Sequence, residues 1–270
     1  KLTSAVEKLD VSFAAIIGTP VPAVIGTDYK ALGRMTEKKT GLPVLTIDTN
    51  GMDLYDKGQE KAWLALFKKF AVDEMPVKKG RVGIIGATPQ DLSDLSAGDQ
   101  LRQIFADDAK KAVCYGMGDG LDAVKQAASA EYNLVVSPSA LETAKYLQKQ
   151  FGTPYVVGYP LAKTMLPEAD YSGKKVLIVH QQVMANAFRE ELKMRGASEV
   201  KVCSWFDMKP ELCEEDDVYL KEEDDFTELA ADSKWDVIIA DDCMKSMLPK
   251  FGGQFIGIRH FAVSGKLGGC

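Results

Sequence analysis

The stretch Ala130–Thr164, AEYNLVVSPSALETAKYLQKQFGTPYVVGYPLAKT, predicts a strand, a sharp turn, a helix and a second strand. The apolar run Tyr132–Val136 ends at the turn Ser137–Ser139, and apolar residues then recur at helical spacing until Gly152. The run Thr153–Val157 reads as a second buried strand. Such a strand–helix–strand unit gives a parallel sheet, which binds ligands at the carboxyl ends of its strands. The serine-containing turn lies at one of these ends.

The composition is that of an ordinary globular chain. Of its 270 residues, 46% are hydrophobic and 27% are charged. The net charge of −6 argues against a nucleic-acid partner, because neutralising phosphates requires clustered Lys and Arg. No apolar run reaches the roughly 18 residues that a membrane span needs, and no secretory signal is visible. We therefore expect a cytoplasmic protein with neither a nucleic-acid nor a membrane partner. Because the chain starts at Lys1 rather than Met, we also expect that its N-terminal part is missing.

The five cysteines are scattered through the chain. They are Cys114, Cys203, Cys213, Cys243 and Cys270. Their spacing fits neither a disulfide scaffold nor a CxxC metal knuckle, so a reducing cytoplasm is the simplest setting.

Short buried strands alternate with helical patterns along the chain. The further strands that we expect are Ser12–Gly18, Val44–Asp48, Val82–Gly86, Lys111–Tyr115, Val176–Val179, Val200–Ser204, Val237–Ala240 and Phe255–Ile258. Continuous apolar runs of this kind are typical of parallel sheets that helices cover on both faces. The predicted fold class is therefore α/β, with three Rossmann-like parallel-sheet units.

Breaks in the pattern separate three predicted units, residues 1–76, 77–168 and 169–270. The polar segment Pro76–Gly80 is predicted to be a linker, and Pro167–Gly173 carries turn residues at the second boundary. Helices are expected at Gly58–Phe70, Met184–Arg195 and Met244–Phe251.

Two glycine clusters follow strands without completing a nucleotide-binding motif. Gly83–Gly86 lacks the third glycine and is followed by Pro89, and Gly116–Gly120 lacks the expected spacing after it. Tight turns at strand ends are the favoured interpretation of both clusters.

Both histidines of the chain follow predicted strands. His180 ends the strand Val176–Val179, and His260 follows the last strand. A histidine at such a position can ligate a metal or carry a proton, or it can simply be a hydrogen-bonded edge residue. Both readings stay open at this point.

Acidic residues gather in two places after the second boundary. The run Glu211–Asp225 is predicted to be a solvated loop of like charge. Asp241 follows the strand Val237–Ala240, where we favour a helix cap for Met244–Phe251 over a metal site.

Several segments together, in order, resemble the nitrogenase component 1 family. The matching segments are PAVIGTD (Pro22–Asp28), GLPV (Gly41–Val44), VGIIG (Val82–Gly86), NLVV (Asn133–Val136), FGTPY (Phe151–Tyr155), Lys174–Val179 and DFTEL (Asp225–Leu229). The family includes nitrogenase molybdenum–iron protein subunits, cofactor-assembly scaffolds and dark-operative reductases of tetrapyrroles. Its N-terminal region with early cluster cysteines has no counterpart here.

The resemblance implies a metal cluster at a subunit interface, held mostly by cysteine thiolates. Aligned on Ile25 and Gly26, Pro20 stands at one of the family's ligand cysteines, and Ser137 stands at the cysteine that holds the molybdenum-type cofactor. Iron–sulfur clusters need thiolate ligands. We therefore expect an iron–sulfur cluster, if present, between subunits rather than within this chain alone. The resemblance also implies anaerobic chemistry, a related subunit in a homo- or hetero-oligomer, and an iron–sulfur ATPase that supplies electrons.

Three functional hypotheses follow. The preferred one is a nitrogenase-like oxidoreductase subunit with a ligand in an interdomain cleft. The alternative is a non-catalytic scaffold, or a metallocofactor- or tetrapyrrole-binding protein without the redox ligands. A periplasmic-type binding protein is the third, and it would need an export signal. The predicted cleft residues are Gly18, Thr19, Pro20, Ser137, Ser139, His180 and His260. The sequence identifies no catalytic residue and no metal ligand.

Overall fold

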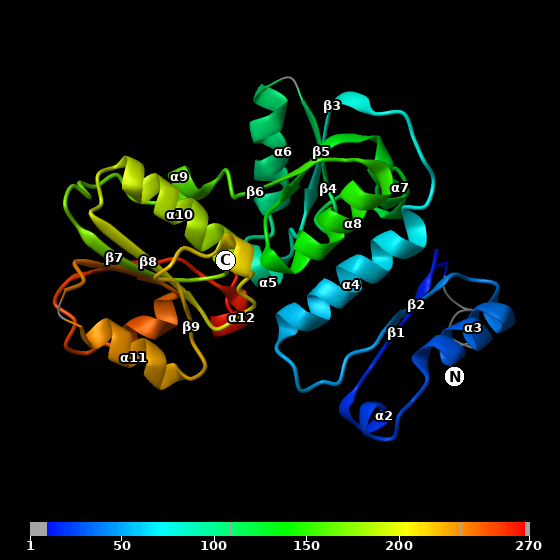
Figure 1. Ribbon diagram of the computed structural model, residues 1–270, viewed down its shortest axis with the longest axis horizontal. Coiled ribbons are helices and arrows are strands. Elements are labelled where there is room, and N and C mark those ends of the chain that lie inside the picture. The colour runs from blue at the N-terminus through cyan, green and yellow to red at the C-terminus, as the bar shows by residue number, and fades with distance from the viewer. Residues whose placement is uncertain (1–9, 109, 233, 268–270) are drawn as a thin grey trace.

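The structure is a computed structural model that describes residues 10–108, 110–232 and 234–267. It contains three sheets of parallel strands flanked by helices (Figure 1). The first sheet pairs β1 (Ala14–Ile17) with β2 (Val44–Ile47). The second has the order β4 (Lys111–Cys114), β3 (Lys78–Ile85), β5 (Ala130–Val135), β6 (Tyr155–Val157). The third has the order β11 (Gln254–Gly257), β10 (Val237–Ala240), β7 (Lys175–Val179), β8 (Glu199–Ser204), β9 (Val218–Tyr219). The predicted α/β fold class is confirmed.

Helix α4 (Tyr55–Phe70) joins the first unit to the second. In Figure 1 it lies between the β1–β2 sheet, which α3 (Tyr29–Thr40) covers on the other side, and α8 (Leu141–Phe151). Its buried aromatic side chains are Trp63, Phe67 and Phe70, and they pack in one apolar cluster with Ile85 and Leu141 of the second unit. The burial of these large side chains holds the two units together.

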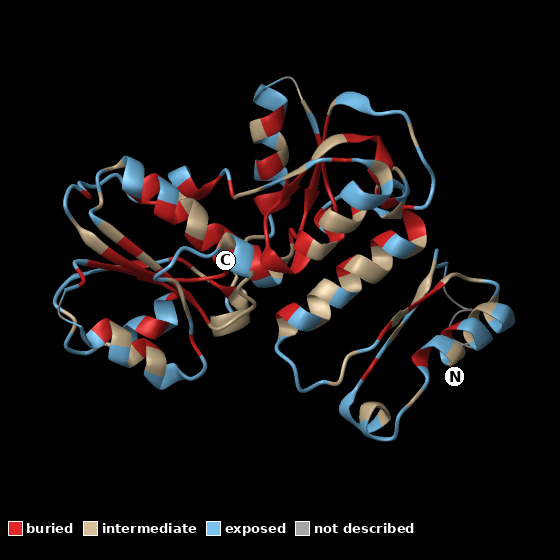
Figure 2. Ribbon diagram, viewed as in Figure 1, coloured by how far each residue is buried: buried red, intermediate tan, exposed pale blue. Residues whose placement is uncertain are grey.

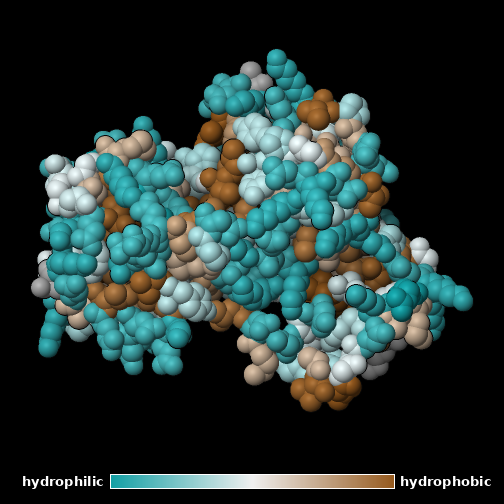
Figure 3. Space-filling view, in the orientation of Figure 1, coloured by the Kyte–Doolittle hydropathy of each residue, from teal (hydrophilic) through white to brown (hydrophobic). Residues whose placement is uncertain are grey.

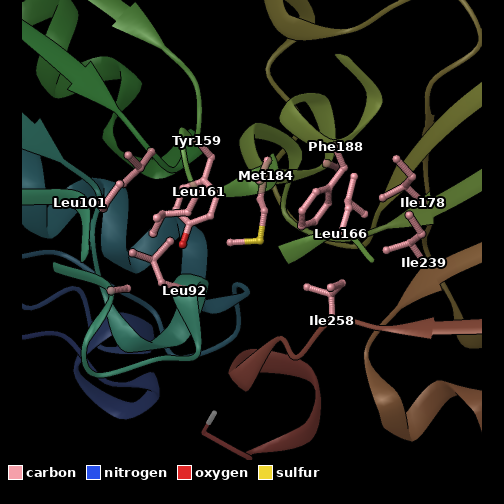
Figure 4. Close-up of a cluster of buried hydrophobic side chains, with 14 of the residues drawn as sticks. Leu92, Leu101, Tyr159, Leu161, Leu166, Ile178, Met184, Phe188, Ile239 and Ile258 are labelled. Carbon is pink, nitrogen blue, oxygen red and sulfur yellow. The ribbon is translucent and has the colours of Figure 1, made fainter. Parts of the chain in front are cut away.

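A second apolar cluster runs without interruption from the second sheet into the third (Figure 4). Leu101 of α6 (Ala97–Asp107) and Tyr159 contribute from the second unit. Met184 and Phe188 of α10 (Gln182–Met194) and Ile239 contribute from the third. The opposite face of the third sheet is covered by α11 (Glu223–Ala231), around buried Phe226 and Trp235. Figure 2 shows the same burial as red along the central strands of both sheets.

Shorter helical segments connect these elements. They are α2 (Pro20–Val24), α5 (Pro89–Leu92), α7 (Leu121–Lys125), α9 (Ala162–Met165), α12 (Phe261–Ser264) and the 3-10 turns η1 (Ala127–Ser129), η2 (Pro138–Ala140), η3 (Pro210–Leu212) and η4 (Asp242–Met247). No helix in the described part of the chain combines the length and the apolar character that crossing a membrane requires.

The structure corrects several predicted elements. The proline-rich stretch Thr19–Pro22, which from its prolines we expect to be a turn after the first strand, is mostly helix α2, since proline is tolerated in the first turn of a helix. The expected linker Pro76–Gly80 already belongs to β3 from Lys78 onward. Helix α4 begins at Tyr55, three residues earlier than predicted.

The last predicted helix, Met244–Phe251, is wrong. The chain there forms the 3-10 turn η4 and then irregular structure, because Pro249 has no N–H to continue an α-helix and two glycines follow Phe251. Asp241 is nevertheless the cap of this turn, since its Oδ1 accepts from the backbone N–H of Cys243 at 2.9 Å.

The acidic run Glu211–Asp225 is not wholly a solvated loop. It contains β9, and the buried carboxylate of Asp217 pairs with the buried guanidinium of Arg189 at 2.5 Å. One of these carboxylates therefore has a structural role that the charge pattern did not reveal.

Gly86 makes the turn that leads from β3 towards α5. Its φ of 95° lies in the region that favours glycine, and an added Cβ would stand 2.9 Å from the Cβ of Ala140 and 3.0 Å from that of Ser137. The turn therefore needs glycine both for its backbone conformation and for space.

We expect Gly86→Ala to lower the free energy of unfolding by about 2 to 5 kcal/mol, from strained backbone and overpacking together. Gly152→Ala is the matched control. Gly152 has a φ of 73° with open space around it, so only the backbone strain of about 1 kcal/mol applies. Urea unfolding at pH 7 measures both. Equal losses in the two variants would show that crowding at Gly86 has no effect.

Candidate functional site

The three units meet at the hydroxyl of Tyr55. Tyr55 begins α4 in the first unit, and its hydroxyl donates to Oδ1 of Asp91 in α5 of the second unit at 2.5 Å. The same oxygen lies 3.1 Å from Nε2 of His260, which follows β11 in the third unit. Because the phenolic proton is directed at Asp91, the Nε2–H of His260 is the donor in the second hydrogen bond. We call Asp91, Tyr55, His260 and His180 the junction.

Asp91 is a carboxyl group enclosed in the protein, with an exposed fraction of 2%. Besides Tyr55, it accepts from Nε2 of Gln59 at 3.1 Å, and no ion pair involves it within the described ranges. Burial raises the pKa of the Asp91 carboxyl, and hydrogen bonds from Tyr55, Ser137 and Gln59 oppose that rise. Burial, together with the charge of Asp91, raises the pKa of Tyr55, so its phenol keeps its proton.

The two histidines are stacked face to face. Their ring centroids are 4.5 Å apart at an interplanar angle of 17°, and both side chains are buried. Nδ1 of His180 accepts from the N–H of Gln181 at 2.9 Å, so the proton is on Nε2, which donates to the carbonyl of Arg259 at 3.2 Å. Burial lowers the pKa of His180 to about 4, and burial and the neighbouring ring lower that of His260 well below its ordinary value. Both rings are therefore neutral at pH 7.

Asp241 fixes the backbone that carries His260. Its Oδ2 accepts from the backbone N–H of His260 at 2.7 Å and from the hydroxyl of Ser264 at 2.8 Å. Burial opposes ionisation of Asp241, but these hydrogen bonds outweigh it and lower the pKa of its carboxyl. Asp241 is thus an ionised group that positions His260 through its backbone and does not contact the other side chains of the junction in the described hydrogen bonds.

The serine turn lies against the same junction. The hydroxyls of Ser137 and Ser139 are 2.9 Å apart and both side chains are buried. Nε2 of Gln181, the neighbour of His180, donates to the carbonyl of Val136 at 3.0 Å. The structure therefore brings the predicted residues Ser137, Ser139, His180 and His260 to one place.

The other predicted cleft residues lie elsewhere in the first unit. Gly18 follows β1, and its carbonyl accepts from the hydroxyl of Thr49 at 2.8 Å. Thr19 precedes α2 and Pro20 begins it, beside an exposed apolar patch at the bottom of Figure 3 that includes Val21, Val24 and Ile25. The described contacts of Gly18 and Pro20 stay within this unit, so the structure does not gather them with the histidines.

Sequence reasoning missed Tyr55, Gln59 and Asp91. The one available signal for Asp91 was its place after the strand Val82–Gly86, at the same sheet edge as Ser137. Tyr55 and Gln59 lie one turn apart at the start of α4, and Tyr55 fell outside the predicted helix.

A groove of about 440 Å³ between the first and third units opens beside the junction. It is lined by Met52, Asp53, Leu54, Asp56, Lys57, Asp207, Met208 and Tyr219. A hollow of about 450 Å³ between α11 and η4 lies at the amino ends of the third sheet's strands, away from the junction. Since parallel sheets bind ligands at their carboxyl ends, the groove is the better candidate for a ligand.

Comparisons with known proteins agree with this architecture. A family described as nitrogenase component 1 type oxidoreductase matches residues 1–165. A solved structure titled "Nitrogenase Cp1 at pH 6.5" is similar with a TM-score of 0.69 at 13% identity, over 95% of this chain and 71% of that one. A second, "Nitrogenase Cp1 at pH 5", gives a TM-score of 0.65 at 15% identity, over 98% of this chain and 68% of that one. No curated protein matches in sequence.

Asp91→Asn is expected to leave the free energy of unfolding at pH 7 unchanged or to raise it. The new amide keeps an oxygen for Tyr55 and cannot carry the negative charge that burial disfavours on Asp91. Rotation of the Gln59 amide then presents its Oε1, which lacks a partner, to the new N–H. Tyr55→Phe should instead lower it by about 1 to 3 kcal/mol, because Asp91 loses its hydroxyl donor. Urea unfolding compares the two. A loss above about 2 kcal/mol in Asp91→Asn would show that the charge itself holds the junction together.

The buried histidines should make the fold sensitive to acid. The unfolded chain takes up a proton on His180 near pH 6.5 and the folded chain only near pH 4, so the unfolding free energy falls as pH drops between these values. The full effect corresponds to about 3 kcal/mol. The raised pKa of Asp91 has the opposite effect, because it makes the unfolding free energy rise as pH drops. The contribution of His180 therefore has to be isolated by comparing a variant with the wild type.

We therefore expect His180→Gln to lose less unfolding free energy than the wild type between pH 7 and pH 4.5, whatever its stability at pH 7. Urea unfolding at several pH values measures the difference in slope. Identical slopes would mean that His180 is protonated in the folded protein as readily as in the unfolded chain.

Proposed function

Because this chain belongs to the nitrogenase component 1 type oxidoreductase family, we propose that it is a reductase subunit that binds its ligand at the junction and the adjoining groove. Its electrons come from an iron–sulfur ATPase outside the chain. The observation that carries the proposal is the hydrogen-bonded series Asp91–Tyr55–His260, which places three proton-carrying groups where the three units meet.

The described residues do not fit an iron–sulfur cluster held by this chain alone. Within the described ranges, no group of three or more His, Cys, Asp or Glu side chains stands close enough to hold a metal ion. The described cysteines do not converge, because Cys114 and Cys203 are buried in separate apolar clusters and Cys213 and Cys243 are exposed. Cluster ligation requires thiolates. Cys270 lies outside the described residues.

This donor set suits proton supply rather than electron storage. A reduction consumes protons as well as electrons, and the junction offers a carboxyl group of raised pKa joined through a phenol to a neutral imidazole. When Nδ1 of His260 takes up a proton from water or the ligand, its Nε2–H can pass to the Tyr55 oxygen while the Tyr55 proton passes to Asp91, so the imidazole and the phenol both end neutral. The reverse series releases a proton from Nδ1 of His260. No atom other than these protons moves.

A second function has its own support. Burial of Ser137, His180 and His260, together with the missing thiolates, favours a non-catalytic scaffold or a metallocofactor- or tetrapyrrole-binding protein. Such a protein would need the groove and the family's fold but not the hydrogen-bonded series Asp91–Tyr55–His260. Asn at position 91 would then serve as well as Asp91.

Anaerobic isolation of the chain with its bound partners, from the cells that make it, tests the proposal. The chain alone, reconstituted with ferrous iron and sulfide, should show no cluster in absorption or paramagnetic resonance spectra. The complex should contain iron–sulfur clusters and reduce its substrate at the expense of ATP. Asp91→Asn should form the same complex and lower the reduction rate about 100-fold, the lower range for a lost acid–base group. A complex without iron or ATPase would overturn the redox proposal and support the scaffold.

A further inference from the structure

Two aromatic contacts place Phe206 over the reactive groups of the junction. Its ring centroid lies 4.9 Å from that of Tyr55 and 5.0 Å from that of His260, both at edge-on angles above 70°. Phe206 is half-buried, whereas His260 beneath it has an exposed fraction of 1%. The Phe206 ring therefore separates His260 and Tyr55 from solvent on this side.

The residues after Phe206 are held to the first unit by polar contacts. The carboxylate of Asp207 pairs with Nζ of Lys57 at 2.5 Å and with Nζ of Lys209 at 2.6 Å, and its backbone N–H donates to Asp56. Lys57 is 45% exposed in its side chain. Asp207 and Lys209 are largely enclosed, with side-chain exposures of 10% and 12%, and Lys209 also pairs with Glu60 of α4. Salt therefore screens the pair with Lys57 more than the pair with Lys209, and the segment is attached by these few polar contacts alone among the described ones.

Both ends of this short segment are fixed to the third unit. Nε1 of Trp205 donates to the carbonyl of Glu222 at 3.1 Å. The backbone N–H of Lys209 donates to Oε1 of Gln182 at 2.7 Å, and Nε2 of Gln182 donates to the carbonyl of Lys209 at 3.1 Å. The backbone N–H of Phe206 also donates to the hydroxyl of Ser204 at 3.1 Å. The part that can move most easily is therefore the Phe206 side chain with Asp207 and Met208, and the groove that Asp207 and Met208 line can receive the displaced ring.

The rest of the junction is closed by apolar packing. The first unit is joined to the second, and the second to the third, by clusters of fully buried side chains such as Phe67 and Phe188. Separating either pair of units would expose large apolar surfaces, which is far less favourable than breaking the contacts of Asp207. Access to the junction is therefore easiest at Phe206–Met208.

We propose that Phe206–Met208 is a gate, which closes the junction when its polar contacts are made and admits the ligand from the groove when they are broken. This rests on the proposed function of the junction as a ligand site. The wild-type gate is closed in the structure and opens transiently, more often at high ionic strength.

The two histidines provide a specific readout, because they are the only ones in the chain and both lie under the gate. Diethylpyrocarbonate modifies neutral imidazoles and is followed by absorbance at 240 nm, with the site assigned by peptide mass spectrometry. At pH 7 and low salt the wild type should react slowly, His260 before His180. Its rate should rise with sodium chloride.

Phe206→Ala should raise the rate of His260 modification about tenfold, since two aromatic contacts are lost. Asp207→Asn should raise it about two- to fivefold and make it less sensitive to salt. Lys234→Met is the control, because Lys234 pairs with Glu199 at 2.8 Å on the exposed surface of the third unit, away from the gate. It should react like the wild type.

Unfolding in urea, measured on the same variants, separates gate opening from loss of the fold. If Phe206→Ala does not fold, the rate of His260 modification in the near-isosteric variant Asp207→Asn still tests the gate. Rates in both gate variants equal to the control, or rates that simply follow the free energy of unfolding, would overturn the gate. The readout needs no ligand, so it tests the gate alone, and the iron and ATPase measurements test the proposed function independently.

Discussion

The hydroxyl of Tyr55 in the first unit contacts a side chain of each of the other two units, Asp91 of the second and His260 of the third. Placing the Asp91 carboxyl there removes it from water, which is unfavourable by several kcal/mol unless its oxygens are hydrogen-bonded. Tyr55 and Gln59 supply those bonds from successive turns of α4, so the start of this helix has to be held in place. The apolar packing of α4 against the second sheet provides that support.

The backbone near Asp91 is constrained from the other side as well. Ser93, two residues later, has a φ of 57°, and its hydroxyl accepts from the backbone N–H of Phe261 at 2.6 Å. Phe261 directly follows His260. The same short segment thus holds Asp91 against Tyr55 and connects the second unit to the end of β11, which His260 follows. The left-handed backbone conformation of Ser93 is unfavourable for a non-glycine residue, and these contacts offset it.

Much of the architecture follows from sequence patterns that act locally. Runs such as Val176–Val179 are apolar throughout because both faces of a parallel strand are covered, and the fold class could be predicted from them. His180 and His260 could be selected because both follow such runs. The stacking of the two rings could not be predicted, because it depends on the order of the strands in the sheet. Strands β7 and β11 flank β10, and this order brings both histidines to the carboxyl end of β10. Asp91 was missed because a carboxylate in a Pro-Gln-Asp turn usually faces water.

The parallel order of the strands has one electrical consequence. Helices that follow strands begin at the carboxyl edge, so the N-termini of α4, at Tyr55, and of α10, at Gln182, both point towards the junction. Each carries about half a positive charge from its aligned peptide dipoles. These dipoles partly offset the negative potential that the Asp91 and Asp56 carboxylates produce at Tyr55. They favour the ionised form of Asp241 and make the burial of Asp91 less unfavourable. The side chains of the groove act in the opposite sense, because Asp53, Asp56 and Asp207 line it together with one lysine, Lys57. The helix dipoles therefore act at the buried end of the path, and the carboxylates act at its entrance.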